Sequence, residues 1–118
     1  MSARDRMLLV VLALAYIPGT PGLGVDTRTD GPAALAVVYG VAFFAPLAAL
    51  AASWKWPLAA AWLAVVSGIF AVILPALDLA GVLASPPPPG MVVLNVVILV
   101  LGLAVIWRGR LRTRRLLA

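Results

Sequence analysis

The stretch that decides the fold lies between Lys55 and Asp78, and over residues 56–77 it reads WPLAAAWLAVVSGIFAVILPAL. It contains no charged side chain, and its one hydroxyl group belongs to Ser67. A helix needs about 20 predominantly apolar residues to cross a hydrocarbon core of about 30 Å. The stretch therefore predicts a transmembrane helix.

The composition of the whole chain supports a membrane protein. Of its 118 residues, 64% are hydrophobic, whereas soluble domains have roughly 45–50%. A soluble fold of this size buries only about two thirds of the surface that its unfolded chain exposes. So much apolar surface could not be hidden from water, and we expect a single integral membrane domain over residues 1–118.

Charged residues divide the chain into four long uncharged stretches. Once the polar and proline-rich ends are trimmed, they predict spans over residues 7–25, 33–53, 58–83 and 91–107, followed by a basic tail over 108–118. The links between the spans are short. The predicted fold class is an all-α membrane protein, a bundle of four transmembrane helices.

The positive charges predict both termini in the cytoplasm. When the first span begins inside, Arg28 is the one residue among nine Lys and Arg that falls outside, and cytoplasmic loops carry the excess of these residues. The expected anchors at the inner interface are Trp54, Trp56, Trp107, Arg108, Arg110, Arg112, Arg114 and Arg115. We expect a multi-pass protein of the plasma membrane whose arginine tail contacts anionic lipid headgroups rather than nucleic acid.

The first span contains helix breakers at Pro18 and Gly19, so we expect its helix to be short or broken there. In the favoured interpretation the helix ends early, and residues 18–32 fold back as an external cap. Alternatively, the break lies within the membrane and lines a cavity, as broken helices of transporters do. The less favoured alternative is a cleaved signal peptide ending at Gly24, since the helix breakers spoil the region before such a cut.

The side-chain inventory leaves little room for catalysis. The chain has neither Cys nor His, and its four acidic residues are all aspartates. Thiol chemistry, imidazole ligands and the commonest general base are thereby excluded. We expect no catalytic residue, no metal site, no cofactor and no enzymatic activity.

Four polar residues within the predicted spans form a candidate site for a cation or a polar headgroup: Asp78, Asn95, Tyr39 and Tyr16. Counting about 1.5 Å per residue from Trp56 places Asp78 roughly 33 Å up, near the outer interface. We therefore expect its carboxylate to be hydrated or bonded to its own loop. We expect Asn95 to form an interhelical hydrogen bond, because an amide that faces lipid is unsatisfied. Bonding between helices is the favoured role of the group.

Small residues at four-residue spacing, Ala60, Ala64 and Gly68, indicate a close-packing face on the third span. Gly40 and Gly102 indicate further close contacts between helices.

The expected function is that of a small accessory or interaction subunit, either as a homo-oligomer or within a larger membrane complex. The alternatives are a small oligomeric transporter or channel, and a binder of lipid or another apolar ligand. The loops are too short to hold a soluble active site.

Overall fold

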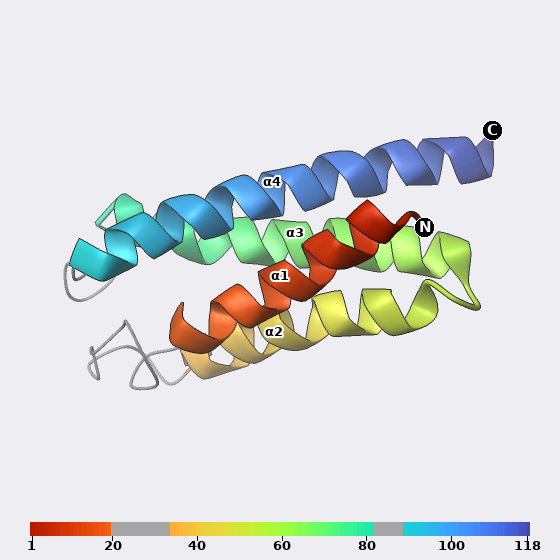
Figure 1. The fold of residues 1–118 in the computed structure, drawn as a ribbon. Coiled ribbons are helices and arrows are strands. Elements are labelled where there is room, and N and C mark those ends of the chain that lie inside the picture. Colours follow the sequence, from red (N-terminus) through yellow and green to blue (C-terminus); the bar gives the residue numbers. More distant parts are fainter. Residues whose placement is uncertain (20–33, 82–88) are drawn as a thin grey trace.

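The computed structural model describes residues 1–19, 34–81 and 89–118, which form an antiparallel bundle of helices without a β-strand (Figure 1). The helices are α1 (Ala3–Gly19), α2 (Ala34–Ala52), α3 (Pro57–Leu79) and α4 (Pro89–Leu117). The predicted all-α class is confirmed for these residues. Two of the helices, α3 with 23 residues and α4 with 29, are long and apolar enough to cross a membrane.

The helix bounds differ from the predicted spans mainly at the C-terminal ends of three helices, and α1 also begins at Ala3 rather than at residue 7. The first helix, α1, ends at Gly19, so Pro18 and Gly19, where the sequence predicts the end or break, still belong to the helix. Residues 20–25 of the first predicted span and the remainder of the predicted cap or break lie outside the described residues. The third, α3, ends before residue 83 because Gly81 takes a positive φ of 74°, a conformation that commonly follows a helix C-terminus. The fourth, α4, continues through the basic tail to Leu117, since arginine and leucine are good helix formers.

The helices form a ring in which each packs against two neighbours. The contacts are most extensive between α3 and α4, followed by α2 with α3, α1 with α2, and α1 with α4. As a result, α1 and α3 lie diagonally opposite each other. The core between them includes Leu9 and Leu12 of α1, Leu74 of α3 and Ile98 of α4.

Glycines bring α3 and α4 close together. A Cβ atom added to Gly68 would lie 2.7 Å from the carbonyl oxygen of Gly102, and one added to Gly102 would lie 3.2 Å from that of Gly68. Farther along α4, a Cβ atom on Gly109 would lie 3.3 Å from the carbonyl oxygen of Ala61. The close contacts predicted at Gly68 and Gly102 are confirmed. The contact predicted at Gly40 is wrong, because a Cβ atom there would meet no atom of the described residues within 4 Å.

The replacement Gly68→Ala should force α3 and α4 apart, because the obstacles to its Cβ include backbone atoms of α4. We expect a loss of about 1–3 kcal/mol in the free energy of unfolding, as for other overpacked cores. The measurement is reversible unfolding by sodium dodecyl sulfate in mild-detergent micelles, followed by circular dichroism. Gly40→Ala is the matched control, since it adds the same methyl group to a helix interior with free space. Equal stability of the two variants would contradict close packing at Gly68.

Candidate functional site

The structure brings the four candidate polar residues together as two pairs. In the first pair, Asn95 Nδ2 of α4 donates a hydrogen bond of 2.7 Å to Asp78 Oδ2 of α3. Both residues are 3% exposed. The interhelical hydrogen bond predicted for Asn95 is confirmed. The prediction that the Asp78 carboxylate is hydrated is wrong, whereas its alternative, a bond to the loop after α3, falls largely on residues 82–88, which lie outside the described residues. Counting residues along α3 predicts how far Asp78 lies from the start of the helix, but not the direction in which its side chain points. The side chain points toward α4 rather than toward water.

The second pair joins Tyr16 of α1 to Tyr39 of α2. Their ring centroids are 6.2 Å apart, with an edge-to-face angle of 68° between the rings. This geometry is a favourable one for aromatic side chains. The pair lies at the contact between neighbouring helices and fixes the orientation of the Tyr16 ring.

The Tyr16 hydroxyl reaches across the ring of helices to α3. It donates a buried hydrogen bond of 2.8 Å to the carbonyl oxygen of Ala71. In a regular helix, the backbone N–H of the residue four positions later would donate to that oxygen, but this residue is Pro75, which has no N–H. The tyrosine thus supplies the donor that the proline removes.

Other buried polar groups are likewise satisfied within the bundle. The hydroxyl of Ser67 donates to the carbonyl oxygen of Leu63 at 2.6 Å, and that of Thr113 donates to Gly109 at 2.9 Å. Among the described residues, every buried side-chain nitrogen or oxygen has a hydrogen-bond partner. In the same part of the chain, no cluster of three or more acidic residues could hold a metal ion. The arrangement is suited to holding helices together.

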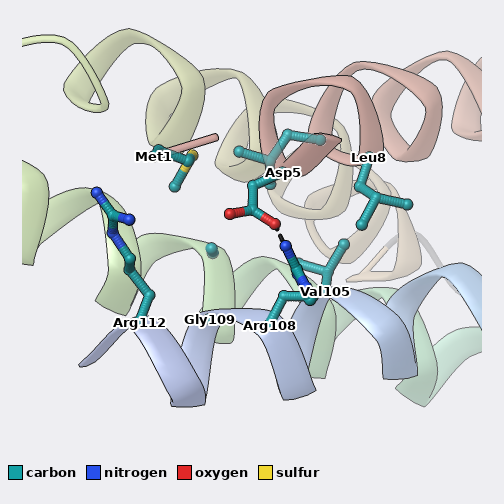
Figure 2. Close-up of a pocket in the computed structure, with 9 residues that line it drawn as sticks. Met1, Asp5, Leu8, Val105, Arg108, Gly109 and Arg112 are labelled. Atoms are coloured by element: carbon teal, nitrogen blue, oxygen red, sulfur yellow. Dashed lines mark hydrogen bonds and ion pairs between the residues drawn. The ribbon is translucent and has the colours of Figure 1, made fainter. Parts of the chain in front are cut away.

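At the end of the bundle that carries both termini, an ion pair joins α1 to α4. Figure 2 shows Asp5 pointing toward Arg108, whose Nε lies 2.8 Å from Asp5 Oδ1. The two side chains are 14% and 39% exposed, respectively. Sequence reasoning missed this pair, because 103 residues separate its members and their contact depends on α1 lying beside α4.

The ion pair sets the charge of Asp5, which precedes the first predicted span. Burial pushes the pKa of the Asp5 carboxyl upward, but hydrogen bonds from Arg108 and Ser2 and the charge of Arg108 outweigh it and hold the pKa below its ordinary value. The ionised form is therefore favoured by folding. Its contribution to stability is present above the ordinary carboxyl pKa and is lost as the pH falls through the lowered value. The cavity beside the pair, lined also by Met1 and Arg112, has a volume of about 10 Å³, which is room for about one water molecule.

The turn between α2 and α3 carries basic and aromatic residues at this same end. The Arg6 guanidinium lies 4.3 Å from the ring centroid of Trp54, and its Nε donates to the Ser53 hydroxyl at 3.0 Å. The Lys55 ammonium lies 5.8 Å from the ring of Trp56. Cation–π contacts of this kind attract a cation to the ring face. The contacts of Arg6 with Trp54 and Ser53 fasten the start of α1 to the turn, whereas the contact of Lys55 with Trp56 lies within the turn.

The predicted anchor residues lie on the surface at this end. Trp54, Trp56 and Trp107 are between 61% and 65% exposed, so their rings are free to meet the headgroup region. Their role at a membrane interface stays a prediction.

No protein-family model, no curated protein and no solved structure matches the chain. Its function is therefore inferred from its helices, its buried polar pairs and the placement of its charges.

Proposed function

We propose that this chain is a four-pass integral membrane protein with both termini in the cytoplasm, and that it serves as a non-enzymatic interaction subunit. The observation that carries the orientation is the gathering of positive charge at one end of the bundle. The antiparallel helix order places both termini and the turn between α2 and α3 at that end (Figure 1). Nine Lys and Arg residues minus Arg28, which lies outside the described residues, leaves eight, and all eight lie there.

The dimensions of the helices suit a bilayer. At about 1.5 Å per residue, the 23 residues of α3 extend roughly 35 Å, and the 19 residues of α2 extend roughly 28 Å. The hydrocarbon core is about 30 Å thick. At 17 residues, α1 is the shortest helix, but it supplies the buried Leu9, Leu12 and Tyr16, which favours its retention over cleavage as a signal peptide.

A role as an interaction subunit is supported by how the polar groups are used. Asp78 with Asn95, Tyr16 with Ala71, and Asp5 with Arg108 each join two helices. The outward face of α4, in contrast, is apolar and exposed. Its exposed residues recur every three or four positions: Val93, Val96, Val100, Leu103 and Trp107. Such a face is suited to lipid or to a helix of a partner.

A second candidate function, a small transporter or channel, is favoured by the burial of Asp78. An acidic side chain within a membrane helix often marks a path for protons or cations, and Asp78 is 3% exposed within α3. The bond from Asn95 favours the structural role.

The proposed topology predicts where reporters are active. A reporter that works only in the cytoplasm should be active when fused after Ala118, because the eight positive residues hold that end inside. A reporter that works only outside should be active when inserted between Ser85 and Gly90. Activity is measured in whole cells, with each fusion quantified by immunoblot as the control. An externally located Ala118 would overturn the orientation.

The structural role of the polar pair predicts that Asn95→Leu is destabilising. The variant removes the donor from a buried oxygen of Asp78, and we expect a loss of about 1–3 kcal/mol in the free energy of unfolding, measured in detergent micelles. Val96→Leu is the control, since this neighbouring side chain is 48% exposed. If Asn95→Leu matched the control, the pair would not hold the helices together.

The transporter alternative predicts a different pattern for Asp78→Asn. A carrier of protons or cations would keep its stability and lose uptake into proteoliposomes when the ionisable group is removed. We expect no uptake above that of empty liposomes in either the native protein or the variant. Uptake by the native protein that Asp78→Asn abolishes would overturn the proposed structural role.

A further inference from the structure

The basic end of α4 presents its arginines on two different sides of the helix. Arg108 and Arg112, four residues apart, line the small cavity beside Asp5 and Met1 on the α1 side (Figure 2). Arg110 and Arg114, also four residues apart, line a different hollow on the α3 side. Residues four positions apart share a face of a helix, whereas residues two positions apart do not. The tail is therefore not a uniform basic surface.

The hollow on the α3 side is an open groove of about 310 Å³. Its wall is apolar and aromatic, from Trp62 and Val65 of α3 and Ile106 of α4. The groove lies beside the place where Gly109 brings the two helices together, since a Cβ atom on Gly109 would lie 2.9 Å from Val65 Cγ2. Its volume is at the small end of the range of about 300–1,000 Å³ that ligand pockets occupy.

The two arginines of the groove have no acidic partner among the described residues. Asp5 pairs with Arg108, and the other described aspartate, Asp78, lies near the opposite end of α3. Both Arg110 and Arg114 are exposed. The groove thus combines two uncompensated guanidinium groups with an apolar wall. An occupant that matches both features carries negative charge and an apolar chain.

We propose that this groove binds one anionic phospholipid, with its phosphate against Arg110 and Arg114 and an acyl chain along Trp62, Val65 and Ile106. Guanidinium groups bind phosphate oxygens through paired hydrogen bonds, and tryptophan rings favour the headgroup level of a membrane. The proposal rests on the proposed orientation, which places this end of α4 at the cytoplasmic leaflet, where anionic lipids attract basic segments. It assigns the lipid contact to two of the five tail arginines.

The test is native mass spectrometry of the full chain released from detergent micelles that contain phosphatidylglycerol or phosphatidylcholine. We expect one retained phosphatidylglycerol per chain and no comparable retention of phosphatidylcholine. Arg110→Gln with Arg114→Gln should weaken that retention roughly thirtyfold. The matched control, Arg4→Gln with Arg115→Gln, removes the same charge from exposed residues outside the groove and should leave retention unchanged. Equal losses in the two double variants would overturn the groove in favour of diffuse attraction to the basic end.

Two further experiments test which part of the lipid is recognised, and the topology reporters show whether a negative lipid result rejects the groove or the orientation. Trp62→Ala leaves every charge in place and should weaken the retention of phosphatidylglycerol by removing the apolar wall. Glycerol 3-phosphate, which carries the phosphate without the chains, should not displace the lipid at equal concentration. Displacement by it would instead indicate a site for free phosphate compounds. The topology reporters do not depend on the groove, so a failed lipid test with a cytoplasmic Ala118 rejects the groove alone.

Discussion

The carbonyl oxygen of Ala71 imposes the constraint on which the arrangement of helices depends. Pro75 removes the N–H that would bond to this oxygen inside α3, and the oxygen is buried in the bundle, where an unpaired carbonyl is costly. The donor comes from Tyr16, on the helix diagonally opposite. The length of the tyrosine side chain thus sets how closely α1 approaches α3, and its edge contact with Tyr39 of α2 fixes the direction from which it approaches. One side chain therefore places three of the helices relative to one another.

The fourth helix, α4, is held by close packing at glycines and by two polar pairs, one toward each end of the helix. Gly68 and Gly102 let the backbones of α3 and α4 approach closely, so dispersion contacts act over a long interface. Asn95 bonds to Asp78 toward one end, and Arg108 pairs with Asp5 toward the other. Polar bonds of this kind fix the rotation of a helix as well as its position, because a turned helix would leave buried polar groups unsatisfied.

Local properties of the sequence predict the helices well. Apolar length and the breakers around each stretch lie within a short window, so α2 at Ala34–Ala52 falls within one residue of the predicted 33–53. The need of Asn95 for a partner could also be predicted, because it follows from chemistry alone. A proline at position 75 also implies that the carbonyl oxygen of Ala71 lacks its usual backbone donor. No feature of the nearby sequence, however, identifies Tyr16 as the residue that donates to it.

The remaining features depend on which helices are neighbours and which way they face. The burial of Asp78 could not be predicted from its position along α3, because that position leaves the rotation of the helix open. The pair of Asp5 and Arg108 requires α1 to lie beside α4, a relation that no short window contains. The division of the tail arginines requires the tail to be helical, whereas the sequence predicts a basic extension without a face. These features belong to the packed bundle rather than to any one segment.

The most direct test of this arrangement is a double-mutant cycle between Tyr16 and Pro75, read as free energies of unfolding in detergent micelles. Tyr16→Phe alone should cost about 1–3 kcal/mol, because it leaves the buried carbonyl oxygen of Ala71 without a donor. In the Pro75→Ala background, the backbone N–H at position 75 is available to that oxygen, and the same Tyr16→Phe change should cost much less. An equal cost in both backgrounds would contradict the central claim that the tyrosine hydroxyl replaces the hydrogen bond that the proline removes.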